Sequence, residues 1–142
     1  MSDCTLTRDD FRNIAQHLLV NDIAFVAAQV QNPFVVYLPN QLLVLDTKWK
    51  LYRMLRQYCL VLRACAATSV RLSKVEAQIT APGQETYRVL KTYADAHGDS
   101  LGHVDVTYFV RSKSHRRVIE MVEYTRNTLL DAHCAVPMPQ AA

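Results

Sequence analysis

The sequence of 142 residues contains little of what many catalytic motifs require. It has three Gly, too few for a glycine-rich loop that holds phosphate, and it contains neither HExxH nor CxxC. Nucleotide hydrolysis and zincin-type metal chemistry therefore lack their usual motifs. The five His are scattered, without a pair at i and i+4, so we expect no metal site and no cofactor.

An excess of one charge and long hydrophobic runs are also missing. The 16 Lys and Arg exceed the 13 Asp and Glu by +3, which predicts binding to neither nucleic acid nor a membrane. The apolar stretches from Ile23 to Val30 and from Leu42 to Leu45 are much shorter than the about 20 residues of a transmembrane helix. Acidic residues precede any apolar run, unlike in a secretory signal peptide. We therefore expect a cytoplasmic protein.

The cysteines do not predict a metal site or a disulfide framework. Cys4, Cys59, Cys65 and Cys134 lack the spacing of metal ligands. In a reducing compartment, buried thiols behave as small apolar side chains. We expect a structural role for them.

The composition is that of a globular domain. Half of the residues are hydrophobic and 20% are charged, and a chain of this length can bury roughly 70% of the surface of its unfolded form. We predict a single domain over residues 1–134. The segment 135–142 has two Pro and no periodicity, which predicts a disordered tail.

Two helices are predicted near the start of the chain. Thr7 and Asp10 have the spacing of a capping box, so a helix should begin near Arg8. Asp22 can cap a second, short helix that reaches Val30. The first helix has one apolar stripe, formed by Phe11, Ile14, Ala15, Leu18 and Leu19.

A hairpin and a long helix should follow. The runs 34–38 and 41–45 are β-branched or apolar and flank a Pro-Asn turn. Asp46 or Thr47 can cap the long helix, which has an apolar stripe on one side. The opposite side carries three arginines, together with two large apolar residues that suggest a covered surface: Arg53, Arg56, Arg63, Trp49 and Leu60.

From Val70 onward the pattern alternates with period two and predicts strands. Around Pro82-Gly83 the simplest register pairs Ala77 with Arg88, a poor match that predicts a bulge or a different loop length. The clearest strand pair is 104–110 with 118–122. Its turn predicts that 106 faces 121, 107 faces 120 and 108 faces 119. One face is then apolar, with Val104, Val106, Tyr108, Val110, Ile119 and Met121, and the other is mixed, with His103, Asp105, Thr107, Phe109, Val118, Glu120, Val122 and Tyr124.

The order of elements and several segments resemble one superfamily. These segments surround Asp22, read FVVYLPN at 34–40 and read VDVTYFVRSKSHRRVIEMVEYT at 104–125. Over residues 7–130 the chain resembles the SnoaL-like, or nuclear transport factor 2-like, superfamily with its cystatin-like α+β cone. The resemblance implies N-terminal helices packed on a curved, mainly antiparallel sheet, an internal pocket and a homodimer formed through the sheet. Members include steroid isomerases, polyketide cyclases, dehydratases and non-catalytic binding modules, so the resemblance implies no single activity.

The chain departs from the catalytic members at one position. Steroid isomerase-like and cyclase-like members carry a general-base Asp before the proline that ends the early strand, where this chain has Leu38 before Pro39. Asp105 and Glu120 on the mixed face are the candidates to replace that catalytic base. The alternative interpretation is that both are solvated or interface carboxylates.

Several residues could line the pocket. Tyrosines could donate hydrogen bonds to a developing oxyanion. The candidate pocket residues are Phe11, Tyr37, Tyr58, Thr107, Phe109 and Tyr124, although Tyr58 could also belong to the core.

The leading hypothesis is a domain that binds a small hydrophobic or amphipathic molecule in an apolar pocket. The first alternative is a cofactor-independent isomerase, polyketide cyclase or dehydratase that uses Asp105 or Glu120 with a tyrosine. The second is a non-catalytic protein-interaction module with a filled interior. Because both faces of the final strand pair carry apolar side chains, we also expect a homodimer that packs sheet against sheet.

Overall fold

The computed structural model describes residues 7–113 and 116–128, which form three helices and one six-stranded sheet. The helices are α1 (Arg8–Leu19), α2 (Ile23–Ala27) and α3 (Lys48–Ala64). The strands are β1 (Val30–Leu38), β2 (Gln41–Leu45), β3 (Ser69–Ala81), β4 (Gln84–Ala94), β5 (Ser100–Lys113) and β6 (Arg116–Asn127). The predicted tail 135–142 and the domain boundary at 134 lie outside the described residues.

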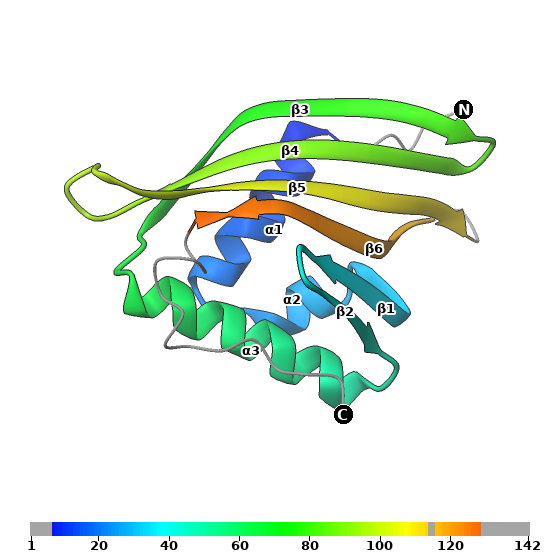
Figure 1. The fold of residues 1–142 in the computed structure, drawn as a ribbon, viewed down its shortest axis with the longest axis horizontal. Helices are drawn as coiled ribbons and strands as arrows, with labels where there is room; N and C mark the ends of the chain where they lie inside the picture. The colour runs from blue at the N-terminus through cyan, green and yellow to red at the C-terminus, as the bar shows by residue number, and fades with distance from the viewer. Residues whose placement is uncertain (1–6, 114–115, 129–142) are drawn as a thin grey trace.

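The strand order is β2-β1-β6-β5-β4-β3, and only the β1–β6 pair is parallel. The long strands curve, and the helices all lie on the concave side of the sheet (Figure 1). The predicted fold class, an α+β domain with N-terminal helices on a mainly antiparallel sheet, is confirmed. We call the face toward the helices the inner face and the opposite face the outer face.

Local capping fixes the helix starts as predicted. The Asp10 carboxylate accepts a hydrogen bond from the Thr7 backbone N–H at 2.7 Å. The Asp22 carboxylate accepts one from the Phe25 N–H at 3.3 Å, and the Thr47 hydroxyl accepts one from the Lys50 N–H at 3.1 Å. Each cap satisfies a backbone donor that the first helical turn leaves free. The second helix is shorter than predicted, because it ends at Ala27 and residue 30 already begins β1.

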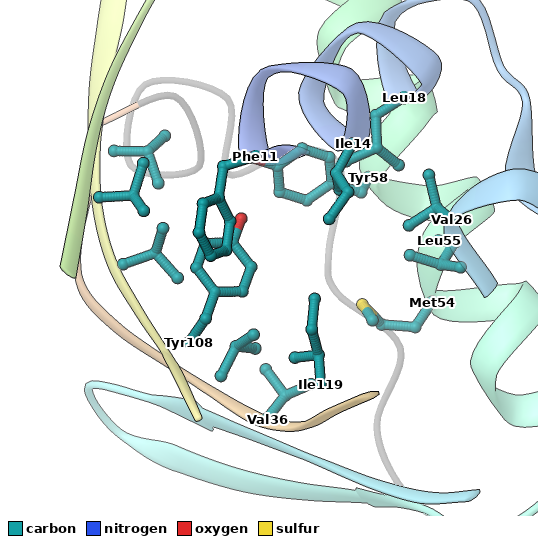
Figure 2. Close-up of a cluster of buried hydrophobic side chains, with 14 of the residues drawn as sticks. Phe11, Ile14, Leu18, Val26, Val36, Met54, Leu55, Tyr58, Tyr108 and Ile119 are labelled. Atoms are coloured by element: carbon teal, nitrogen blue, oxygen red, sulfur yellow. The ribbon is translucent and has the colours of Figure 1, made fainter. Parts of the chain in front are cut away.

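Apolar side chains of the helices and of the inner face form one core. Figure 2 shows residues of α1, α2 and α3 facing residues of the sheet, among them Phe11, Leu18, Val26, Met54, Leu55, Tyr108, Ile119 and Val36. The ring of Phe11 lies 4.8 Å from that of Tyr108 and 5.1 Å from that of Tyr87. This packing joins the first helix to the centre of the sheet.

The predicted register of the last strand pair is wrong. Tyr108 pairs with Val122, Phe109 with Met121 and Val110 with Ile119. The register shifts once between Phe109 and Val110 and again between Asp105 and Val106, and each such bulge reverses which face the following residues occupy. Three face assignments are therefore corrected.

Met121 belongs to the outer face, because it pairs with the outward-facing Phe109. Val122 and Tyr124 belong to the inner face, because they pair with the inward-facing Tyr108 and Val106. The bulge predicted near Pro82-Gly83 is confirmed, since the β3–β4 register shifts between residues 79 and 81.

Candidate functional site

A small cavity of about 40 Å³ lies between the helices and the inner face. Most of its lining is apolar and comes from all three helices and from β1, β5 and β6. Polar groups enter it from Gln29, Lys91, Tyr108 and Tyr124. A cavity needs at least about 10–15 Å³ of such volume to hold one water, so this one has room for a small group.

Lys91 is the most unusual residue of this site. It lies in the middle of β4 and only 2% of it is exposed. Its ammonium donates a hydrogen bond to the Tyr108 hydroxyl at 3.2 Å and lies 5.8 Å and 6.0 Å from the ring centroids of Tyr108 and Tyr93. Within the described part of the chain, no carboxylate lies within ion-pair distance of it. By contrast, the nearly buried Arg117 is paired with Glu85.

Two tyrosine hydroxyls, one of them beside Lys91, have no hydrogen-bond partner among the described residues. They belong to Tyr58 on α3 and Tyr93 on β4, and both are buried. Tyr58 lies close enough to Tyr93 and Tyr124 for both phenols to influence its ionisation, but the Tyr58 and Tyr93 hydroxyls do not meet hydrogen-bond geometry. Buried polar groups normally find a partner, so these two hydroxyls remain able to bind one.

Burial keeps the phenols of Tyr58, Tyr108 and Tyr124 protonated. It raises the pKa of Tyr108, and it raises the pKa values of Tyr58 and Tyr124 well above 10, with a smaller contribution from the neighbouring phenols. The cause is desolvation, which disfavours the charged phenolate. At neutral pH these tyrosines are hydrogen-bond donors. We call Lys91, Tyr58, Tyr93, Tyr108 and Tyr124 the lysine–tyrosine cluster.

The structure divides the predicted pocket residues between the two faces of the sheet. Tyr124 lines the cavity, Tyr58 belongs to the cluster, and Phe11 is buried in the adjoining core. Thr107 and Phe109 alternate with buried inner-face residues of β5 and therefore lie on the outer face.

Tyr37 also lies on the outer face, where it is 41% exposed beside Leu42 of β2 and Glu123 of β6. The sequence-predicted pocket set is therefore not brought together at one site. Three of its members lie among the buried residues around the cavity, and three lie across the sheet from it.

Both predicted catalytic carboxylates lie on the outer face. Asp105 forms a two-point ion pair with Arg88, with N–O distances of 3.1 and 2.7 Å. Glu120 pairs with Arg111 at 2.7 Å. The sheet separates both carboxylates from the cavity, and each is engaged by an arginine. Their catalytic role stays a prediction.

The sequence analysis missed Lys91, Tyr93 and Tyr108 as site residues. A signal for Lys91 was present, because it alternates in phase with Tyr87, Val89 and Tyr93. A lysine in phase with buried residues of a strand is a candidate buried cation.

One further motif, which the sequence analysis missed, lies in the β4–β5 connection. Residues 98–102 read GDSLG and match the G-x-S-x-G spacing of a nucleophile elbow. That motif requires a turn from a strand into a helix, whereas here Gly98 lies in the loop between two antiparallel strands and Ser100 begins β5. The Ser100 hydroxyl also has no hydrogen-bond partner among the described residues. The motif lacks the context for hydrolase chemistry.

Neither a metal cluster nor a membrane span is found in the described ranges. No group of three His, Cys, Asp or Glu within 7–113 and 116–128 could hold a metal ion. No helix in those ranges is long and apolar enough to cross a bilayer.

Comparisons with known proteins identify the fold. No protein-family model and no curated protein matches the sequence. Among solved structures, a nuclear transport factor 2-like protein with a cystatin-like fold from Novosphingobium aromaticivorans has a TM-score of 0.64 at 12% identity, over 91% of this chain and 85% of the other. A protein of unknown function with a cystatin-like fold from Nostoc punctiforme has a TM-score of 0.62 at 13% identity, over 84% and 92%.

A candidate ketosteroid isomerase from Shewanella frigidimarina is similar to the same degree, with a TM-score of 0.62 at 11% identity over 80% of this chain and 92% of the other. The chain thus has the cystatin-like α+β fold of nuclear transport factor 2-like proteins. At such identities the likeness concerns the fold, and a function must be argued from the site.

Proposed function

We propose that the protein binds a small amphipathic molecule between its helices and the inner face of its sheet. The observation that carries this proposal is the lysine–tyrosine cluster beside a cavity in an otherwise apolar interior. A core whose only task is stability would place apolar side chains here, because buried polar groups without partners are costly. A few convergent polar groups in an apolar cavity are typical of ligand sites.

The two methionines on opposite sides of the sheet provide the test. Met54 lines the cavity, whereas Met121 lies on the outer face. The full chain, labelled with carbon-13 in its methionine methyl groups, would be titrated with short acids, amides and alcohols. We expect the Met54 resonance to shift saturably and the Met121 resonance to stay in place.

Met54→Leu and Met121→Leu variants would assign the two resonances. A Met54 resonance that no compound moves would contradict the binding proposal and leave the interaction-module hypothesis in its place. Equal shifts of Met121 would indicate binding at the surface.

For the enzyme hypothesis, the positions of Asp105 and Glu120 give no support, because neither lies on the cavity side. An isomerase, cyclase or dehydratase reaction in the cavity would have to use groups of the lysine–tyrosine cluster.

We also propose that the protein forms a homodimer through the outer face. The register places Val44, Val35, Met121 and Phe109 side by side across β2, β1, β6 and β5. Val44 is 40% exposed, and no helix covers this face among the described residues (Figure 1). A row of neighbouring apolar side chains on an uncovered sheet face favours a protein partner, and a second copy packed about a two-fold axis is the simplest one.

A further inference from the structure

Lys91 lies where its inner-face neighbours are apolar or aromatic. Val89 and Tyr93 flank it along β4, and Leu72 and Val104 pair with it from β3 and β5. An ammonium in this position loses its hydration and gains one hydroxyl and two aromatic faces in exchange. An apolar chain such as that of methionine would fill the same space without this loss. A negatively charged partner would therefore stabilise the Lys91 ammonium at this position.

The hydrogen-bonding capacity of the cluster identifies the kind of group. Lys91 has three N–H donors and no acceptor, and one of the three is used on Tyr108. Behind the cavity lining, the hydroxyls of Tyr58 and Tyr93 add two donors that have no partner among the described residues. The cluster thus has more donors than acceptors. A carboxylate complements it, because both of its oxygens only accept hydrogen bonds and its single charge matches the single ammonium.

We propose that Lys91 and its tyrosines bind the carboxylate of a short aliphatic acid, an inference that rests on the proposed binding function. The apolar lining contributed by Ile14, Val26 and Leu55 suits the hydrocarbon end of such a molecule. The cavity of about 40 Å³ limits the chain length, and the unbranched side chain of Met54 can yield to a somewhat longer chain. A phosphate would be larger, with more charge and more acceptor oxygens than this cluster satisfies.

Two isosteric probes and one isosteric variant test the inference. Butanoate and butanamide have nearly the same shape, and only butanoate is charged at neutral pH. Their dissociation constants for the full chain would be measured from the Met54 methyl resonance. We expect butanoate to bind at least about tenfold more tightly than butanamide, because the charged acceptor pairs with the ammonium.

In Lys91→Met this preference should disappear, with butanoate losing affinity and butanamide retaining it. Tyr93→Phe removes one hydroxyl without changing the ring and should weaken butanoate binding several-fold. Lys74→Met is the matched control, because it removes an exposed lysine of β3 that pairs with Glu76 on the surface. It should leave both dissociation constants unchanged. Circular dichroism of each variant would establish that it is folded.

The outcomes separate the two proposals. Equal affinity of the wild-type protein for butanoate and butanamide, or unchanged butanoate binding by folded Lys91→Met, would overturn the carboxylate assignment while the cavity remained a binding site. If neither probe nor any member of the wider panel moved the Met54 resonance, the binding function itself would fail.

Discussion

The Lys91 ammonium and the Tyr108 hydroxyl lie 3.2 Å apart, joined by a hydrogen bond between neighbouring strands β4 and β5. Tyr108 is four residues along β5 from Val104, the residue that pairs with Lys91. The lysine side chain therefore extends along the inner face of the sheet and not out to solvent. Its charged end lies within the core, which has consequences for stability as well as for binding.

Replacing Lys91 by methionine should stabilise the protein in the absence of ligand. The substitution removes a buried ammonium that has no carboxylate partner among the described residues and keeps most of the side-chain volume. We expect the free energy of unfolding to rise by about 1–3 kcal/mol, measured by urea denaturation. The control Lys74→Met should change it by less than about 0.5 kcal/mol. A clear loss of stability in Lys91→Met would mean that the ammonium is net stabilising where it lies.

The buried phenols should lose their protons only at unusually high pH. In the folded protein the pKa values of Tyr58, Tyr108 and Tyr124 are raised by burial, whereas in the unfolded chain they lie near 10. The folded state thus holds protons that the unfolded state releases. Their contribution to stability is complete below about pH 10 and is lost as the pH rises above it.

The ultraviolet absorbance of phenolate would measure this titration. Three of the seven tyrosines should ionise only together with alkaline unfolding. Reversible ionisation of all the tyrosines near pH 10 in a protein that stays folded would contradict the described burial.

The two described cysteines should react slowly with thiol reagents. Cys59 and Cys65 are free and buried, and burial raises the pKa of both thiols, although nearby Arg63 partly opposes this for Cys59. Because the thiolate is the reactive form, we expect labelling in native buffer to be at least about a hundredfold slower than in denaturant. A variant with Cys4→Ser and Cys134→Ser would confine the measurement to these two. Fast native labelling of that variant would show that the α3 side of the core opens readily.

The outer-face dimer should be broken by charge on that face. Light scattering should give a dimer mass for the wild-type chain at micromolar concentration and a monomer mass for Val44→Lys and for Met121→Lys, because each places an ammonium in the apolar row. Val20→Lys is the control, since Val20 is 72% exposed at the C-cap of α1, beside residues of α3. A wild-type monomer would refute the dimer, and a dimer that survives both substitutions would place the interface elsewhere. Ile119 and Val122 of the same strand as Met121 are buried in the core, so charge there would test folding and not the interface.

The sequence by itself determined the local elements and the fold class. Thr7 with Asp10, Asp22, and Thr47 start the three helices as predicted, because a cap acts over three residues of the same chain. The change from helical to alternating periodicity near Val70 located the long strands, because side-chain periodicity is also a local property of the chain.

Tertiary structure alone decided which side chains meet inside. The two bulges in the β5–β6 ladder moved Val122 and Tyr124 to the inner face and Met121 to the outer face, and alternation along one strand cannot reveal where a partner strand will take an extra residue. Lys91 is in phase with the buried residues of β4, but its burial depends on β5 and on helices far away in sequence. A side chain's solvation is set by everything packed around it, so the sequence showed a lysine on a strand and only the assembled core made it a buried cation.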